Sequence, residues 1–275
     1  MRAMTDLVLL VVDRGVATLT FNRPEANNGW TGPLEQAYYD RLEQCEADDA
    51  VKAIVVTGAG RSFCPGADMK MLSAGASGAS GGIGGAGEVQ RTRQPLVYPS
   101  RHTKPLVGAI NGACAGVGLV QALMLDMRFA AAGAKFTVAF ARRGLIAEYG
   151  CAWTLPRIVG QANALDLLMS SRVVLAEEAL QMGLVNRVLP ADELVAATQA
   201  YARDLATNCS PTSMAVMKRQ VVRAWEMDLP QAIDEAFDLM NRSLKKSDFV
   251  EGVTSFVEKR EPSFSPIQAD LIPLA

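Results

Sequence analysis

Two glycine-containing segments each follow an apolar run that is typical of a buried strand. The first is Arg61 to Lys70, after the run that ends at Thr57, and the second is Asn111 to Gly118, after the run that ends at Ile110. A strand-to-helix turn leaves main-chain N–H groups unpaired and directed outward. Two such turns on neighbouring strands could aim two donors at one oxygen atom and form an oxyanion hole. Either segment alone favours a simpler explanation, tight turning and close helix packing, but their matched positions favour a site.

The other residue types that ligate metals or act as nucleophiles show no catalytic pattern. The chain has five cysteines, an odd number, and no C-x-x-C pair. This argues against a disulfide framework and a structural zinc site, so we expect free, mostly buried thiols in a reducing compartment and no metal. The single histidine, His102, lies in a polar link before a strand and is assigned no role.

Residues Ser73 to Gly87 form a low-complexity segment that is predicted to be flexible. Gly82 to Gly87 matches G-x-G-x-x-G, but neither a preceding strand nor a dinucleotide-binding unit surrounds it. Gly78 to Gly82 matches G-x-S-x-G around Ser80, but a nucleophile elbow needs a sharp, rigid turn. We interpret both matches as chance products of the composition.

Composition excludes several classes of protein. The 275 residues are 49% hydrophobic and 20% charged, which is typical of one large globular domain, with or without a small appendage. A net charge of −2 offers no broad basic field for nucleic acid or an anionic membrane. The N-terminal apolar run stops at Asp13 and is interpreted as a strand rather than a signal peptide. No stretch approaches the roughly 20 apolar residues of a membrane helix. We therefore expect a cytoplasmic protein.

Strand, turn and helix alternate along the first part of the chain. A hairpin is predicted around Asp13 to Gly15, and a helix is predicted to open at Pro33. The other predicted strands are Lys52 to Thr57, Leu106 to Ile110, Met127 to Ala131 and Lys135 to Val138. After Pro190 only helical periodicity remains, over residues 191–208, 211–225, 229–246 and 248–259. The prediction is an α/β core over residues 1–190 and a C-terminal helical region over 191–275, for assembly or as a lid.

Six ordered motifs make the sequence recognisable. They are N-R-P-E-A from Asn22, S-F-C-P-G-A-D-M-K from Ser62, I-N-G-A-C-A-G-V-G from Ile110, L-P-R-I-V-G from Leu155, A-E-E-A-L-Q-M-G-L-V-N from Ala176 and F-V-E-K-R from Phe256. Together they resemble the crotonase, or enoyl-CoA hydratase/isomerase, family over nearly the whole chain. The resemblance implies an α/β spiral of ββα units with a C-terminal helical segment, assembled as a homotrimer or as a hexamer of two trimers. It also implies an acyl-CoA thioester as substrate, with no separate cofactor.

The same resemblance assigns roles to individual residues. It implies that the main-chain N–H groups of Ala67 and Val117 form the oxyanion hole; Val117 stands where glycine is usual, but a main-chain donor survives a change of side chain. The implied substrate-binding residues are Arg23, Cys64, Pro65, Gly66, Asp68, Met69, Lys70, Gly116, Phe256 and Lys259. Cys64 to Lys70 would line the adenine and pantetheine path, with Arg23 near the phosphates. Phe256 and Lys259 would close the site from a neighbouring subunit.

Some of these residues have simpler alternatives. Lys70 and Lys259 are explained equally well by surface solubility. Asp68 is more simply explained by holding its turn or capping the short helix that is expected to follow.

The sequence departs from the family pattern at two positions. Hydratases of this family commonly place two glutamates about the substrate double bond, and the motifs align these glutamates with Val120 and Phe140. Neither residue can transfer a proton, which argues against two-carboxylate water addition.

One acid remains in the stretch Arg143 to Gly150, at a position where some family isomerases and a dehalogenase branch carry a working carboxylate. Glu148 has apolar neighbours there, so desolvation would raise its pKa and make it a better base. The alternative is a solvated loop glutamate, or a cap for a helix that starts near Cys151. A single carboxylate suits Δ3 to Δ2 enoyl-CoA isomerisation through an enolate, so an isomerase is expected. A hydratase that uses Glu148 and a catalytically weak acyl-CoA-binding pseudoenzyme remain alternatives.

Overall fold

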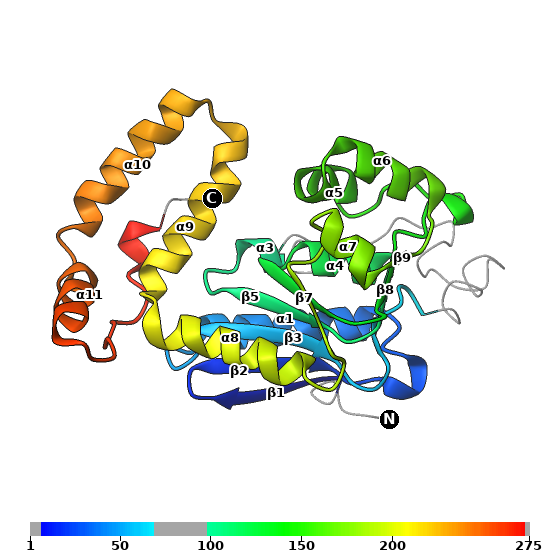
Figure 1. Ribbon diagram of the computed structural model, residues 1–275, viewed down its shortest axis with the longest axis horizontal. Coiled ribbons are helices and arrows are strands. Elements are labelled where there is room, and N and C mark those ends of the chain that lie inside the picture. The colour runs from blue at the N-terminus through cyan, green and yellow to red at the C-terminus, as the bar shows by residue number, and fades with distance from the viewer. Residues whose placement is uncertain (1–6, 69–97, 273–275) are drawn as a thin grey trace.

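The computed structural model describes residues 7–68 and 98–272 and contains two β-sheets (Figure 1). The larger sheet has six strands in the order β1-β2-β3-β5-β7-β10. Its strands are β1 (Val8–Asp13), β2 (Val16–Phe21), β3 (Ala53–Gly58), β5 (Leu106–Ile110), β7 (Met127–Ala131) and β10 (Arg187–Leu189). β1 and β2 form the predicted antiparallel hairpin, and the remaining neighbours pair in parallel.

The smaller sheet has the order β4-β6-β8-β9. Its strands are β4 (Ser62–Cys64), β6 (Ala113–Ala115), β8 (Lys135–Thr137) and β9 (Val174–Leu175). β4, β6 and β8 each follow a strand of the larger sheet along the chain, namely β3, β5 and β7. The chain therefore repeats one step three times, from the large sheet to the small sheet, which is the expected spiral. β4 and β6 lie within the two segments that were predicted to be turns.

The core lies on the larger sheet. Every residue of β3 and β5 is buried, as parallel strands covered on both faces require. Helix α8 (Leu194–Asn208) packs on β2, β3, β5 and β7, while α1 (Gly32–Ala47) packs on β1 and β2. α1 begins near the predicted Pro33, where Thr31 Oγ1 accepts a hydrogen bond from the Leu34 N–H and caps the helix.

Shorter helices complete the part of the chain that precedes α8. They are η2 (Pro24–Ala26), α3 (Tyr98–Arg101), α4 (Val117–Leu123), η3 (Ala141–Arg143), α5 (Cys151–Val159), α6 (Gln161–Ser170) and α7 (Ala176–Gln181). α4 begins at Val117, within the segment Asn111 to Gly118 that was predicted to be a strand-to-helix turn. This start places the first turn of α4 directly after the small-sheet strand β6.

The C-terminal helices follow α8. They are α9 (Pro211–Arg223), η4 (Ala224–Glu226), α10 (Leu229–Ser243), α11 (Ser247–Glu258) and η5 (Ala269–Leu271). α10 and α11 lie beyond α9, away from α5 and α6 (Figure 1). Apolar side chains of both stay exposed, such as Phe237 (58%) and Phe256 (84%). The region has the predicted helical character, but α8 packs on the sheet, and the division of the chain at residue 190 stays a prediction.

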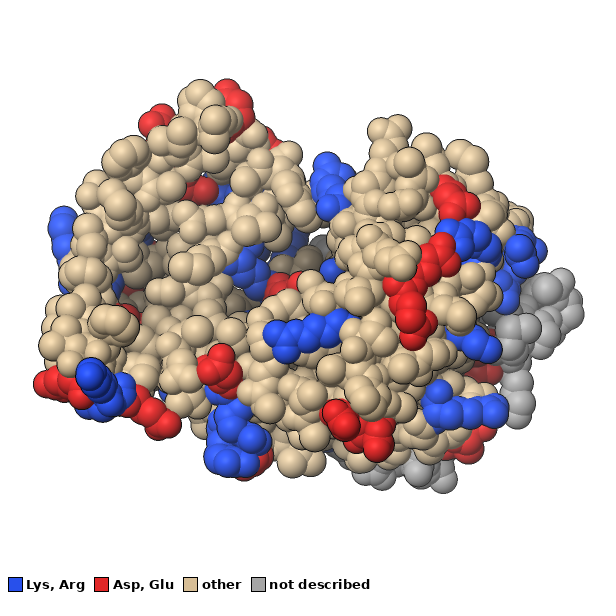
Figure 2. All heavy atoms as spheres, viewed as in Figure 1, with Lys and Arg blue, Asp and Glu red and all other residues tan. Residues whose placement is uncertain are grey.

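Charges of both signs are interspersed over the face shown in Figure 2, where no broad field of one sign is present. None of the helices within residues 7–68 and 98–272 has the length and apolarity that crossing a bilayer requires. All five cysteines are free thiols, and four of them are fully buried, as expected.

Candidate active site

The two glycine-containing segments meet at neighbouring strand ends. Cys64 at the end of β4 pairs in register with Cys114 of β6. Each of the two segments then turns at a glycine with positive φ, which is +108° at Gly66 and +51° at Gly116. A Cβ atom on Gly116 would lie only 3.7 Å from the Gly66 Cα, so the two turns touch backbone to backbone. A Cβ on Gly66 would lie 3.2 Å from the Ala115 carbonyl oxygen, and this tight approach is a reason for glycine there in addition to its φ value.

The amides of Ala67 and Val117 both lack a main-chain acceptor in the described part of the chain. Trp30 N donates to Gly66 O at 2.8 Å, and Asp68 N donates to Trp30 O at 3.0 Å. In this parallel bridge the N–H of the intervening Ala67 points away from Trp30. Val117 is the first residue of α4, so its N–H has no acceptor within the helix. Each turn therefore offers one unused donor.

Both residues line one cavity of about 520 Å³. Its walls come from four segments, residues 23–29, 65–68, 116–117 and 138–149. A Cβ on Gly29 would lie 3.3 Å from the Asp68 Cα, and a Cβ on Gly116 would lie 3.9 Å from the Val138 carbonyl oxygen. Since Gly66 and Gly116 also touch, the four segments follow one another across the cavity. Residues 23–29 lie against the first turn and residues 138–149 lie against the second, and these two segments are called the two ends of the cavity below.

Most of the residues singled out from the sequence come together in this cavity. Those that line it are Arg23, Pro65, Gly66, Ala67, Asp68, Gly116, Val117 and Glu148. Cys64 lies buried beneath the turn, with its Sγ 3.8 Å from the Gly66 carbonyl oxygen. Phe256 and Lys259, at the end of α11, do not line the cavity of their own chain. Met69, Lys70 and the segment from Ser73 to Gly87 lie outside the described residues.

Asp68 holds its turn against the chain that precedes α1. Its Oδ2 accepts a hydrogen bond from Arg23 Nη2 at 3.0 Å, and both side chains are largely buried. Arg23 Nη1 also donates to the Gly29 carbonyl oxygen. This ion pair ties residues 23–29 to the first turn and leaves Arg23 with a bound countercharge at the rim of the cavity. The expected helix after Asp68 lies outside the described residues.

Glu148 stands at the opposite end, just before α5. The N-cap of α5 is Gly150, and no side chain caps the helix; Glu148 contributes only its main-chain oxygen, which accepts from Cys151 N at 2.9 Å. The interpretation of its carboxylate as a helix cap is therefore wrong. Burial raises the pKa of Glu148. Within residues 7–68 and 98–272 its carboxylate has no hydrogen bond or ion pair.

The next residue along the chain, Tyr149, holds a left-handed conformation with φ +53° and also lines the cavity. Such strain in a non-glycine residue is frequent at functional sites. Ala139 on the same side of the cavity is similarly strained, with φ +59°.

The two positions that correspond to the hydratase glutamates are apolar and buried. Val120 lies inside α4 and is 1% exposed, while Phe140 lines the cavity and is 5% exposed. Glu148 is therefore the carboxylate at this end of the cavity among the described residues.

Three further lining residues, Glu25, Arg143 and Tyr149, were not singled out from the sequence as site residues. Tyr149 directly follows Glu148, Glu25 lies two residues after Arg23, and Arg143 begins the stretch that carries Glu148. Their neighbourhood was the only signal available.

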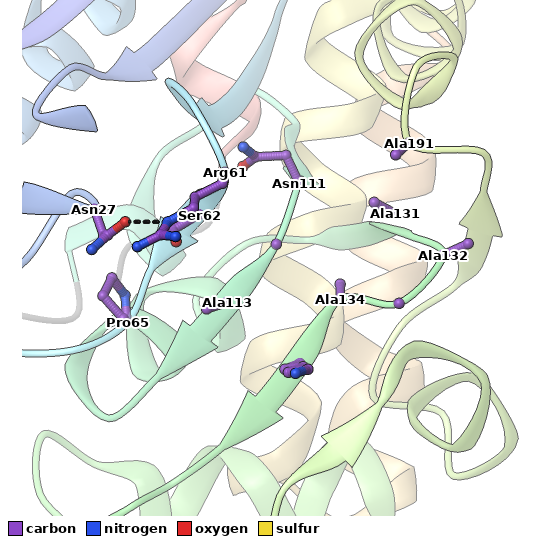
Figure 3. A pocket seen from close by; sticks show the side chains of 13 residues that line it. Asn27, Arg61, Ser62, Pro65, Asn111, Ala113, Ala131, Ala132, Ala134 and Ala191 are labelled. Carbon is purple, nitrogen blue, oxygen red and sulfur yellow. Dashed lines mark hydrogen bonds between the residues drawn. The ribbon is translucent and has the colours of Figure 1, made fainter. Parts of the chain in front are cut away.

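A second hollow of about 480 Å³ adjoins the first, and Asn27 and Pro65 line both. Arg61 Nε donates to Asn27 Oδ1 at 2.8 Å across one wall (Figure 3). Much of the remaining lining consists of alanine and glycine. The described residues around this hollow carry no carboxylate, thiol or imidazole. This hollow therefore lacks the groups for acid–base chemistry that the first cavity has.

Comparison with known proteins agrees with this architecture. The family model described as enoyl-CoA hydratase/isomerase matches residues 12–266. The 1,2-epoxyphenylacetyl-CoA isomerase of Escherichia coli K12 is 35% identical over 264 residues, covering 95% of this chain and 99% of that protein. The enoyl-CoA hydratase ACTT3 of Alternaria alternata is 32% identical over 261 residues, covering 91% and 83%.

Solved structures show the same relationship. A probable enoyl-CoA hydratase/isomerase from Mycobacterium abscessus superposes with a TM-score of 0.83 at 29% identity, covering 94% of this chain and 98% of that one. The enoyl-CoA hydratase EchA12_1 from Mycobacterium marinum is 45% identical, with a TM-score of 0.68 and coverage of 81% and 100%. With a crotonase fold, two paired turns and a family match over most of its length, this chain belongs to the enoyl-CoA hydratase/isomerase family.

Proposed function

We propose that the protein moves the double bond of a 3-enoyl-CoA to position 2, with Glu148 as its acid and base. The observation that carries the proposal is the content of one cavity. Glu148, with its pKa raised by burial, shares this cavity with the unused amides of Ala67 and Val117. The positions of the two hydratase glutamates hold Val120 and Phe140.

The chemistry starts at the thioester carbonyl. Its oxygen lies between the Ala67 and Val117 N–H groups, which form the oxyanion hole in this proposal. Glu148 removes a proton from C2, and the electron pair delocalises into a dienolate whose negative oxygen is held by both amides. The protonated Glu148 then returns the proton at C4, and the double bond is left between C2 and C3. Each donor of this kind is typically worth about 3 kcal/mol, and a positioned base contributes about 10²–10⁴ in rate.

The layout of the cavity supports an orientation for the substrate. Residues 23–29 hold the coenzyme A portion, with Arg23 near its phosphates, and residues 138–149 surround the acyl portion beside Glu148. Coenzyme A arrives as part of the substrate, so the reaction requires no separate cofactor. The free thiols support a reducing, cytoplasmic location.

Assembly completes the site in this proposal. The exposed apolar side chains on α10 and α11 support a homotrimer or a hexamer of two trimers. Phe256 and Lys259 then close the cavity of a neighbouring chain. Phe256 is 84% exposed in the single chain, which suits an interface residue.

Water addition is the second candidate reaction, because several similar proteins are named as enoyl-CoA hydratases. In that case Glu148 would activate the water alone or with an unusual partner. The third candidate, a catalytically weak acyl-CoA-binding protein, is favoured by the apolar residues Val120 and Phe140.

The test offers 3-enoyl-CoA and 2-enoyl-CoA thioesters to the native protein and to Glu148→Gln. We expect the native protein to move the double bond faster than it adds water. The isomerisation rate of Glu148→Gln should be lower by a factor of about 10²–10⁴, and the variant should still bind coenzyme A. Glu25→Gln is the matched control, because Glu25 is a carboxylate at the other end of the same cavity. Normal turnover by Glu148→Gln rules out the assigned base, and tight binding without turnover by native protein favours the binding-protein alternative.

A further inference from the structure

Arg143 is a cation inside the candidate active site that the proposed isomerisation does not use. It ends the short helix η3 and lines the cavity at the same end as Glu148. Its Nη1 donates to the Ala139 carbonyl oxygen at 2.8 Å. No carboxylate of the described chain forms an ion pair with it. The rest of its guanidinium group therefore retains donors for a ligand.

The charge of Arg143 does not serve Glu148. A nearby cation would lower the pKa of that carboxyl group, whereas burial raises it, and the described residues show no ion pair between Arg143 and Glu148. The two groups thus lie on one wall of the cavity without forming a pair. Arg143 also differs from Arg23, the other cation among the described residues that line the cavity, because Arg23 is neutralised by Asp68.

Arg143 is an exposed residue at the mouth of the cavity, and apolar side chains line the cavity beside it. Phe140 and Leu145 line the same end, and Leu145 is 38% exposed. An apolar wall that ends in a guanidinium group suits a ligand with a hydrocarbon chain and a terminal anion. Guanidinium groups bind carboxylates through two parallel hydrogen bonds, which gives both strength and orientation.

We propose that Arg143 binds a carboxylate at the far end of the substrate's acyl chain, so that the preferred substrates are ω-carboxylated enoyl-CoA thioesters. This inference rests on the proposed function, which orients the acyl chain. The two turns fix the thioester carbonyl in the middle of the cavity, and the coenzyme A portion occupies the end formed by residues 23–29. The acyl chain therefore runs past Glu148 toward Phe140 and Arg143. Glu148 reaches C2 and C4, while Arg143 holds the distal end and sets the register of the chain.

The test compares two 3-enoyl-CoA thioesters of equal chain length, one ending in a methyl group and one in a carboxylate. Native protein should show a kcat/KM at least about tenfold higher for the carboxylated substrate, as expected for a charge-assisted pair. Arg143→Met should lose that preference, because the fall in kcat/KM should be larger for the carboxylated substrate than for the neutral one. Arg143→Lys should keep part of the preference, because it retains the charge without the planar fork.

Arg142→Met is the matched control. Arg142 is the adjacent arginine of η3, but its Nε donates to the Ser170 carbonyl oxygen and it does not line the cavity. It should leave the preference intact. Thermal melts of all three variants separate lost recognition from lost folding.

Two results overturn the inference. One is equal kcat/KM of native protein for both substrates. The other is an equal loss on both substrates in Arg143→Met, which would assign Arg143 to the coenzyme A phosphates. If native protein converts neither substrate, the proposed isomerisation fails instead. In that case calorimetry measures the binding of two saturated acyl-CoA thioesters, one methyl-ended and one carboxylate-ended, to native protein and to Arg143→Met. Native protein should bind the carboxylate-ended thioester more tightly, and Arg143→Met should lose this preference.

Discussion

Gly118 of α4 packs directly against Cys64 of β4. A methyl group on Gly118 would lie 2.8 Å from the Cys64 Sγ and closer still to the Cys64 carbonyl oxygen. The first turn of α4 is thereby pressed onto the end of β4, where the turn that carries Ala67 begins. Only a residue without a side chain permits this contact, and we expect the spacing of the two proposed oxyanion donors to depend on it.

Substituting Gly118→Ala should therefore destabilise the protein and weaken catalysis together. Overpacking of this kind typically costs about 1–3 kcal/mol, because neither the strand nor the helix can withdraw without moving the core. Urea unfolding measures the loss of stability, and kcat for 3-enoyl-CoA measures the effect on the site. Gly32→Ala is the control, since no atom lies within 4 Å of its added Cβ, and it should stay within about 0.5 kcal/mol. Equal stability of the two variants would contradict the packing argument.

The pH dependence of catalysis should report on Glu148. Its carboxyl group must be ionised to accept the C2 proton, and burial raises its pKa above the ordinary 4.5. The kcat/KM for isomerisation should therefore rise with pH through a pKa higher than 4.5. A pH–rate profile from stopped assays measures this limb, and Glu25→Gln should leave it unchanged. A limb at the ordinary carboxyl pKa would mean that Glu148 is solvated.

A pH effect on stability is expected from Glu46 and His102. Glu46 Oε2 lies 2.9 Å from Nε2 of His102, which is 2% exposed, and Thr103 N donates to the same carboxylate at 3.3 Å. Burial by itself would raise the pKa of Glu46, but the hydrogen bonds from His102 and Thr103 outweigh it and lower the pKa to about 2. Because the pKa of Glu46 is lower in the folded protein than its ordinary value of 4.5, the ionised carboxylate stabilises the fold at pH values above 4.5. This stabilisation is lost as the pH falls toward 2.

Replacement of Glu46 by Gln should flatten the acid limb of the stability profile. Because this side chain is 31% exposed, we expect a contribution of about 1–2 kcal/mol at neutral pH. Urea unfolding at a series of pH values below neutrality measures it. Glu177→Gln, at an exposed glutamate on α7, is the control. An unchanged pH slope in Glu46→Gln would show that the pair contributes nothing to stability.

Assembly should depend on the exposed apolar side chains of α10 and α11. Phe237 on α10 is 58% exposed, and a lysine there would place a charge where the proposed interface needs apolar contact. Phe237→Lys should shift the protein from trimer or hexamer to smaller species in analytical ultracentrifugation. Met169→Lys is the control, since Met169 is 69% exposed on α6, away from α10 and α11. A monomeric native protein would remove the basis of the proposed interface.

Local sequence patterns predicted the large elements well. The strand Leu106 to Ile110 agrees with the structure to the residue, and α4 begins within the segment Asn111 to Gly118, where a strand-to-helix turn was predicted. Continuous apolar runs and helical periodicity are properties of neighbouring residues, so they can be read without knowing the fold. β4 and β6 were missed because each has three residues, and their pairing of Cys64 with Cys114 joins segments far apart in the chain.

The candidate site divides in the same way. Motif positions in the sequence identified the two turns, the apolar residues at Val120 and Phe140, and Glu148 as a remaining acid. The contact of Gly66 with Gly116, the partial burial of Glu148 and the presence of Arg143 in the lining of the same cavity appear only in the tertiary structure. Residue types and their order determine which groups are available for chemistry. Packing between distant segments decides which of those groups lose water and meet in one cavity, because burial and proximity belong to the folded chain as a whole.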